Sequence, residues 1–270
     1  MIITRFVCRA CYTRALPQGS VLGPVLFLLY LNELFSQKFL GYISGYVDDL
    51  KLLSVRGIEL QADIKTLTNW LILNKLSINS EKCSVIHVKG KRPFKEDGIK
   101  PSIESHELSK FNDVVDLGVR IDDDMSFRSH AHHVRSKSYR MINLCFKIFS
   151  SKNADLYIYF YKTYVISIIE YCFSVYSSTS ISNINSIERI QRYFTNRLYS
   201  RLFPGSPKIS YKSRLDFFNL HPLETHLYKI DLLNMYRLLH NDLPLPGVGI
   251  SRSTRRPNRI YVSKVNSSYP

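Results

Sequence analysis

The sequence has no long apolar run and no leader-like start. Its apolar stretch 25–31 is far shorter than the ~20 residues that a membrane-spanning helix needs. The first 20 residues carry Arg5, Arg9 and Arg14 and lack an unbroken apolar core, so we expect no signal peptide. Both absences predict that this is not a membrane protein.

Cysteine is also scarce. Five cysteines, an odd number, lie at positions 8, 11, 83, 145 and 172. This usage favours reduced thiols in an intracellular protein, without separating nucleus from cytoplasm. Cys8 and Cys11 have the C-x-x-C spacing, but no second pair follows at zinc-finger distance, so we interpret them as unpaired thiols rather than a zinc site.

Acidic residues are outnumbered. The chain holds 22 Asp and Glu against 37 Lys and Arg, a formal net charge of +15, while 45% hydrophobic residues in a chain of 270 indicate one large or two modest globular domains. Residues 181–270 contain 14 basic and 5 acidic residues, a difference of +9. Such a balance favours a polyanionic partner, most often nucleic acid. The alternative is a generally basic, solvated surface.

The first part of the chain predicts mixed secondary structure. Residues 1–15 alternate loosely and predict one strand. After a sharp loop at 16–20, Ser20 is placed as the N-cap of a helix that ends near Phe35, with Pro24 in its first turn. We expect the buried face of this helix to consist of Leu22, Val25, Leu26, Leu29 and Leu34.

A second amphipathic helix is predicted over about 59–75, and the chain becomes helical from about Ser126. The apolar positions of the 59–75 helix recur at helical spacing at Leu60, Ile64, Leu67 and Leu71. Strands are predicted at 84–89 and in a pair ending near 114–121. Later helices are expected at 127–149, 154–176, 184–202 and about 222–240. The arginine-rich tail beyond Pro244 is predicted to be flexible.

Two adjacent carboxylates, Asp48 and Asp49, lie in an otherwise apolar, β-prone run. The run predicts a hairpin whose tip holds both negative charges. Such a tip is costly unless a Lys or Arg, solvent or a divalent metal that prefers oxygen ligands neutralises it. An ordinary solvated turn is the alternative.

The order of three motifs decides between these readings. A Pro-Gln-Gly-Ser loop opens an apolar helix (16–24 and 27–34), the Asp-Asp hairpin follows (46–52), and a helix then precedes Asn79, Lys82 and Cys83. In this order the chain resembles the reverse transcriptase of non-LTR retrotransposons, the LINE-like and jockey-like elements. The similarity continues at 117–122 and at 187–195, which resemble the end of the palm and the downstream helical region.

The resemblance implies an RNA-directed DNA polymerase with a two-metal Mg²⁺ site. Asp48 would be the principal catalytic metal ligand, with Asp49 beside it. Lys82 matches a lysine near the triphosphate and is a candidate proton donor to the leaving group, or else a solvated lysine.

The implied partners are deoxynucleotides and an RNA template with a DNA primer, or an RNA–DNA duplex. Incoming nucleotide and template would be contacted by Pro17, Gln18, Gly19 and Tyr46. The primer would be supported by Leu117 and Gly118. The helices after Ser126 would form a thumb that grips the nucleic-acid backbone through Arg128, Arg135, Arg189 and Arg192.

One departure from the family pattern is decisive. The polymerase site needs a further Asp on a strand before the Pro-Gln-Gly loop, but the only acidic residue before Asp48 is Glu33. We therefore expect an α+β fragment without fingers: a partial palm (1–122), a helical thumb and downstream region (123–243), and a basic tail (244–270). We expect it to be inactive alone.

Two further hypotheses compete with this one. The chain could be a non-catalytic, basic, nucleic-acid-binding remnant, as the charge of its last third suggests. It could also be an element fossil that never folds stably, because an incomplete palm sheet would expose an apolar edge.

Overall fold

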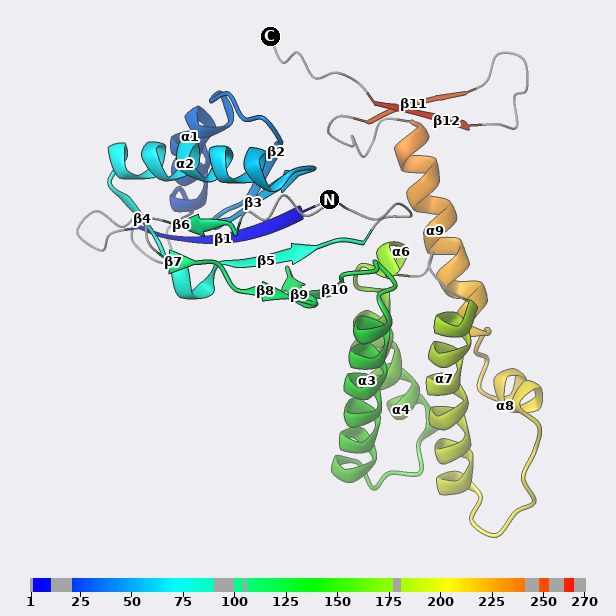
Figure 1. Cartoon of the computed structure of the whole chain (residues 1–270). Helices are drawn as coiled ribbons and strands as arrows, with labels where there is room; N and C mark the ends of the chain where they lie inside the picture. Colours follow the sequence, from blue (N-terminus) through cyan, green and yellow to red (C-terminus); the bar gives the residue numbers. More distant parts are fainter. Residues whose placement is uncertain are drawn as a thin grey trace. The chain divides into compact units, whose positions relative to one another are not determined.

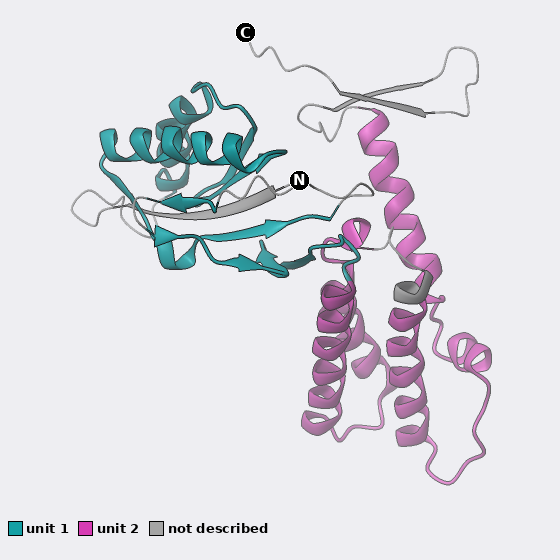
Figure 2. Ribbon diagram, in the orientation of Figure 1, with its two compact units in different colours: residues 1–127 teal, residues 128–270 magenta. Residues whose placement is uncertain are grey.

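The computed structural model describes residues 2–10, 21–89, 100–103, 106–176, 181–240, 248–252 and 260–264, with side chains described in 21–89, 100–103, 106–176 and 185–240. The chain divides into two compact units, residues 1–127 and 128–270 (Figure 2). It is an α+β protein in which small sheets come first and a mostly helical region follows (Figure 1).

A six-stranded sheet forms the centre of unit 1. Its strand order is β2-β3-β1-β5-β8, and β4 also pairs with β1. The strands are β1 (Ile2–Ala10), β2 (Tyr42–Tyr46), β3 (Asp49–Ser54), β4 (Leu76–Ile78), β5 (Ser84–His87) and β8 (Lys110–Phe111). β1 is antiparallel to both β3 and β5, and β8 is parallel to β5. The strand nearest the N-terminus therefore lies in the middle of the sheet.

Two short hairpins complete the strands of unit 1. They are β6 (Ser102–Ile103) with β7 (His106–Glu107), and β9 (Asp113–Asp116) with β10 (Val119–Asp122). The second hairpin confirms the predicted strand pair. The predicted strand at 84–89 is also present, but it ends at His87.

Helix α2 (Gly57–Leu73) packs its predicted apolar face on the sheet. Its four periodic residues Leu60, Ile64, Leu67 and Leu71 are all buried and share one core with Leu50 and Leu52 of β3. A helix with a single apolar stripe buries that stripe against the nearest apolar face. The prediction for this helix is confirmed.

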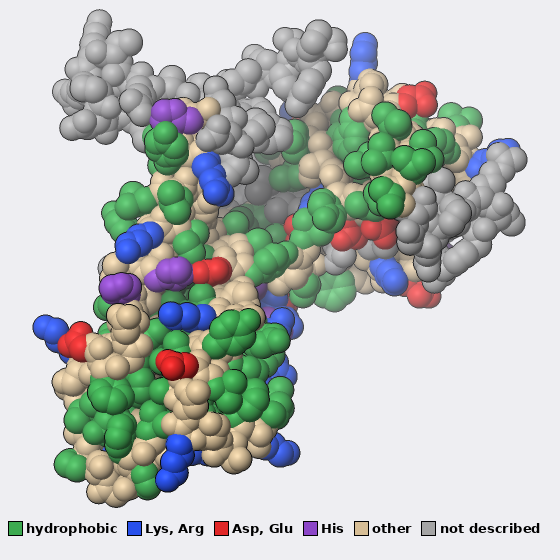
Figure 3. Space-filling model, turned by 180° about the vertical axis from the view of Figure 1, so that it is seen from behind, with side chains coloured by type: hydrophobic (Ala, Val, Ile, Leu, Met, Phe, Trp, Pro, Cys, Tyr) green, Lys and Arg blue, Asp and Glu red, His purple; other side chains and the backbone are tan. Residues whose placement is uncertain are grey.

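Helix α1 (Gly23–Phe35) packs through a different face from the predicted one. Leu22, Val25, Leu26 and Leu29 are 47–67% exposed, and of the predicted residues only Leu34 is buried. The contacting side is instead formed by Gly23, Phe27, Leu31 and Leu34. The prediction failed because α1 is apolar almost all round, so periodicity does not single out one face. Hydrophobic side chains are visible on the surface of unit 1 in Figure 3.

The start of α1 also differs from the prediction. The N-cap position is Leu22, which makes no side-chain cap, and Pro24 falls in the first turn as expected. Ser20, the predicted N-cap, lies outside the described residues.

A buried carboxylate on α2 fixes the beginning of β2. Asp63 is 1% exposed, and its two oxygens accept hydrogen bonds from Leu40 N at 2.7 Å and Gly41 N at 2.8 Å. Glycine is required at 41, because a Cβ there would lie 2.3 Å from the Leu53 carbonyl oxygen. Asp63 thus attaches the strand that leads into the Asp48 turn to the helix beneath it.

Unit 2 is mainly helical. It contains α3 (Arg128–Ile148), α4 (Ala154–Phe160), a π-helical segment (Tyr161–Ile166), α5 (Ser167–Glu170), α6 (Phe173–Tyr176), α7 (Ile181–Leu202), α8 (Tyr211–Phe217) and α9 (Leu223–Leu239). The single helix predicted over 154–176 is divided, since it passes through the π segment and breaks at Cys172, where φ is +54°. Helix α8 was not predicted.

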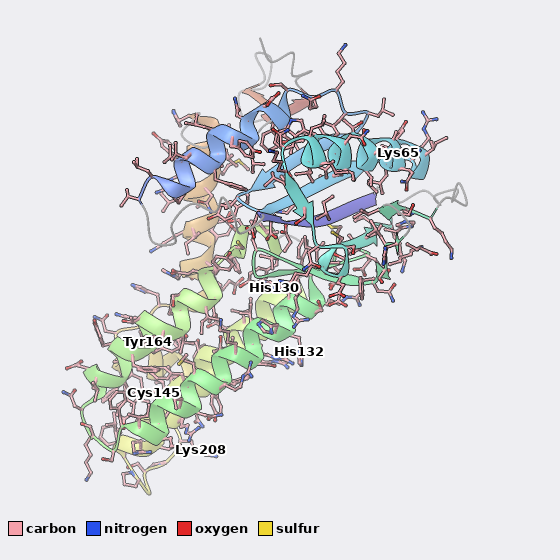
Figure 4. The ribbon with its side chains drawn as sticks, turned by 90° about the vertical axis from the view of Figure 1, so that its left-hand side faces the viewer. Lys65, His130, His132, Cys145, Tyr164 and Lys208 are labelled. Carbon is pink, nitrogen blue, oxygen red and sulfur yellow. The ribbon has the colours of Figure 1, made fainter. Side chains whose placement is uncertain are left out.

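Aromatic side chains fill the core of unit 2. Tyr161 stacks on Phe194 of α7 with ring centroids 4.1 Å apart, and Phe146 of α3 stacks on Tyr157 of α4. Stacked aromatic pairs contribute beyond their buried area. Burial raises the pKa of the Cys145 thiol in the same core to about 11 (Figure 4).

The tail contains two strands that the sequence did not predict. β11 (Val248–Arg252) and β12 (Ile260–Lys264) form an antiparallel ribbon. The flexibility of the tail stays a prediction. Within the described parts of the chain, no helix combines the length and apolar character needed to cross a membrane.

Candidate functional site

The two carboxylates lie at the tip of the β2–β3 hairpin. Tyr46 pairs with Asp49, which leaves Val47 and Asp48 as a two-residue turn. Val47 has φ of +54°, a conformation that a β-branched residue rarely adopts. The tight turn makes Asp48 the apex and Asp49 the first residue of β3.

The hairpin rests on α1 through Gly45. A Cβ at this position would lie 2.7 Å from Leu50 Cδ2 and 3.0 Å from Phe35 Cζ. A larger residue would therefore push the strand off the helix. Glycine permits the close approach that holds the carboxylate turn at the end of the sheet.

Residues of β3 alternate between two faces. Leu50, Leu52 and Ser54 are buried, whereas Asp49, Lys51 and Leu53 are only half-buried. Because successive strand residues point to opposite faces, Asp49 and Lys51 lie on the face opposite the α1–α2 core. We call this the open face of the sheet.

The strand opposite Asp49 offers no carboxylate. Val7 of β1 pairs directly with Asp49, and β1 contains no Asp or Glu. Among the residues that the structure describes, no group of three or more His, Cys, Asp and Glu is placed to hold a metal ion. Within the described residues, Asp48 and Asp49 are thus two adjacent carboxylates that no third His, Cys, Asp or Glu joins into a metal-binding group.

The other predicted residues of unit 1 are partly located. Tyr46 is exposed beside the turn, and Lys82 is exposed at the end of a 3₁₀ turn, Ser80–Lys82. Pro17, Gln18 and Gly19 lie outside the described residues. The structure therefore brings Tyr46 to the carboxylates and gives no position for the Pro-Gln-Gly loop.

Leu117 and Gly118 form the turn between β9 and β10. Both have positive φ, +44° and +83°, and Asp116 pairs with Val119 across them. Positive φ at both positions is the pattern of a type I′ hairpin turn, which glycine favours. Leu117 and Gly118, which were predicted to support the primer, thus form a tight hairpin turn.

A charged residue that the sequence analysis did not select lies next to this turn. Lys51 Nζ is 2.8 Å from Asp116 Oδ1, and both side chains are mostly shielded from solvent. One signal in the sequence points to this pair: the non-LTR reverse transcriptases that the chain resembles favour an aromatic residue where this chain has Asp116. The role of Asp63 was also not predicted, because this residue belongs to no motif and its hydrogen-bond partners are backbone groups.

In unit 2 the four predicted arginines come from two helices. Arg128 is exposed and Arg135 half-buried on α3, and Arg189 and Arg192 are exposed on α7. The Arg192 guanidinium lies over the Tyr211 ring, 4.8 Å from its centroid. Arg192 is therefore partly engaged within the protein.

Helices α3 and α7 run side by side in the same direction. Tyr139 contacts Tyr193 edge-on at 5.1 Å, and Arg201 donates to the carbonyl oxygens of Phe146 at 3.0 Å and Phe149 at 3.3 Å. These contacts join residues about 52–55 apart in sequence. Arg135 and Arg189 have the same separation, so they lie at the same level on the two helices.

Arg135 and Tyr139 of α3 and Arg189 and Tyr193 of α7 mark a surface that we call the α3–α7 face. This face has little negative charge. Helix α3 contains no Asp or Glu, and α7 contains only Glu188. Glu188 Oε1 accepts a hydrogen bond from the Tyr211 hydroxyl, and Glu188 Oε2 accepts from Glu224 N at 2.9 Å. Burial, together with the Glu188 carboxylate, raises the pKa of Tyr211. The Glu188 carboxylate therefore binds groups of α8 and α9, so its negative charge is already engaged within unit 2.

The histidines of α3 differ in their surroundings. His130 is buried edge-on against Tyr176 with ring centroids 4.9 Å apart, whereas His132 is exposed (Figure 4). His130 therefore does not contribute to the exposed surface of α3. Side chains two positions apart on a helix diverge by about 200°, which accounts for the difference.

Comparison with known families identifies the domain that carries the hairpin. Residues 8–121 match the family "Reverse transcriptase (RNA-dependent DNA polymerase)", so this part of the chain is a reverse transcriptase domain. It is distantly homologous to the polymerase of a non-LTR retrotransposon. The RNA-directed DNA polymerase from mobile element jockey of Drosophila funebris is 26% identical over 193 residues, 65% of this chain and 20% of that protein.

A second relative is closer to this chain in size. The uncharacterized protein B0403.1 of Caenorhabditis elegans is 24% identical over 153 residues, which cover 56% of this chain and 76% of that protein. The chain spans only 20% of the length of the jockey polymerase.

Proposed function

We propose that unit 1 contributes the metal-binding hairpin and primer-supporting turn of an RNA-directed DNA polymerase, and that the separate polypeptide does not synthesise DNA. The observation that carries the first half is the tight β2–β3 turn, which presents Asp48 and Asp49 together at the end of a reverse transcriptase sheet. The expected absence of DNA synthesis rests on β1, because the residue of β1 that pairs with Asp49 is Val7, which carries no carboxylate.

Two adjacent carboxylates fit one role of Mg²⁺ in nucleotide transfer. Mg²⁺ is commonly held by one or two carboxylates and completed by water and substrate phosphates. Asp48 and Asp49 would hold it here, and when bound it would activate a primer hydroxyl and neutralise phosphate charge. Tyr46, exposed beside them, would contact the incoming nucleotide. Lys82 would contribute as a proton donor near the triphosphate.

Primer extension tests the proposal directly. Purified full chain with an RNA template, a DNA primer, Mg²⁺ and deoxynucleotides is expected to give no extended product, because one hairpin cannot hold two metals in the required geometry. The Asp48→Ala variant is the control. Extension by the wild-type chain that this substitution abolishes would contradict the proposal.

A gain of metal affinity is expected from Val7→Asp. The substitution adds a third carboxylate at the position paired with Asp49, and affinity for a hard divalent cation rises with ligand charge, here by about tenfold. Binding of Mn²⁺ as the probe, followed by electron paramagnetic resonance, measures this directly.

The matched control is Ile3→Asp, which pairs with Leu53 farther along the same two strands. It adds the same charge away from the turn. Equal gains for both variants would show a general charge effect and contradict the assignment of Val7 to the site.

A second function, nucleic-acid binding without chemistry, is favoured by the α3–α7 face. Arg135 and Arg189 lie at one level beside the Tyr139–Tyr193 pair, and the single carboxylate of these two helices is already engaged. Arginine binds phosphate by charge and by paired hydrogen bonds. We propose an RNA–DNA duplex as its ligand.

A further inference from the structure

A shielded ion pair connects the strand of Asp49 to the β9–β10 hairpin. The Lys51 and Asp116 side chains, 2.8 Å apart, are only 15% and 21% exposed. Lys51 follows Asp49 by two residues, so both lie on the open face of the sheet. A pair that solvent screens so little is a stronger constraint than an exposed one.

The hairpin is also attached at its other end. Lys89, just after β5, donates its backbone N–H to the Asp123 carbonyl at 2.6 Å, and Lys89 Nζ lies 2.7 Å from Asp123 Oδ2. Asp116, in contrast, is the last residue before the Leu117–Gly118 turn. The two attachments at opposite ends fix the direction in which the turn projects.

We propose that Asp116 is a positioning residue that, through Lys51, holds the Leu117–Gly118 turn beside the Asp48–Asp49 hairpin. A primer end on the turn is thereby directed toward the carboxylates. This inference rests on the proposed function of unit 1. It assigns a role to Asp116, the residue that ends β9 directly before the Leu117–Gly118 turn.

Hydrogen exchange of the full chain tests the positioning without any nucleic acid. Asp116→Asn is expected to speed amide exchange in peptides covering 117–120 by about tenfold, since local opening becomes easier, and to leave α2 peptides unchanged. The swap Lys51→Asp with Asp116→Lys is expected to restore slow exchange. Unchanged exchange in Asp116→Asn, or no restoration by the swap, would overturn the proposal.

The same hairpin provides a matched control. Asp113→Asn removes a carboxylate whose pair with Arg120 is longer, 3.6 Å, and more exposed. It is expected to leave exchange at the turn unaltered. If it accelerates exchange as much as Asp116→Asn does, the effect is general to the hairpin and the role of Asp116 is refuted.

Photo-cross-linking tests the consequence for a primer. A hybrid with 4-thiothymidine at the primer 3′ end is expected to cross-link to the turn in the wild-type chain. Most of that yield is expected to be lost in Asp116→Asn and recovered in the swap. Equal yields in wild type and Asp116→Asn would overturn the role in primer placement. A wild-type chain that binds no hybrid, while Asp116→Asn still loosens the turn, would refute the proposed function and support the positioning.

Discussion

Replacing Asp63 by alanine is expected to lower the free energy of unfolding of unit 1 by about 3 kcal/mol, since a hydrogen bond to a charged acceptor contributes about 1.5–3 kcal/mol. The carboxylate is almost fully buried and accepts from the backbone N–H groups of Leu40 and Gly41. Alanine would leave both donors without their acceptor. Because these residues lead into β2, we expect the Asp48 turn to loosen as well.

Trp70 makes this measurement specific to unit 1. It is the only tryptophan of the chain and is 5% exposed on α2, close to the same core. Its fluorescence during urea unfolding of the full chain reports the stability of that core. The absence of a cooperative transition in the wild-type chain would favour the hypothesis of a chain that does not fold stably.

Glu59→Ala is the matched control for Asp63→Ala. Glu59 lies on the same helix and pairs with Arg56, whose side chain is 65% exposed. Removing a surface pair of this kind is expected to change stability by at most about 0.5 kcal/mol. If Asp63→Ala has no larger effect than Glu59→Ala, the assigned role of Asp63 is wrong.

The affinity of the chain for an RNA–DNA duplex is expected to fall by about 150-fold between 50 and 200 mM salt. Four phosphate contacts give a slope of about −3.6 in a plot of log affinity against log salt, because each contact releases condensed counterions. The contacts are those predicted for Arg128, Arg135, Arg189 and Arg192. Fluorescence anisotropy of a labelled duplex across this range gives the slope.

Arg135→Ala with Arg189→Ala is expected to reduce the same salt effect to about tenfold, since two contacts are removed. Lys208→Ala is the control, because Lys208 is an exposed cation in the connection after α7 (Figure 4). It is expected to leave the slope within experimental error. A salt-independent affinity in the wild-type chain would exclude the phosphate-binding role, and equal slopes for both variants would place the contacts elsewhere.

The prediction of buried residues was correct for a helix that has one apolar face and one polar face, and wrong for a helix that is apolar on most sides. Helix α2 has a single apolar stripe, and its buried residues were identified correctly. Helix α1 is apolar on most of its circumference, and four of its five expected core residues are exposed. Periodicity locates a buried face only when a polar face contrasts with it.

The sequence by itself predicted the resemblance to reverse transcriptases, the Asp48–Asp49 hairpin and the basic character of α3 and α7. These follow from local order, spacing and composition, which do not depend on what lies across the fold. Only the tertiary structure placed Val7 opposite Asp49, Lys51 against Asp116 and Asp63 beneath Gly41. Such pairings join residues far apart in the chain, and strand register and helix packing set them, so no local pattern encodes them.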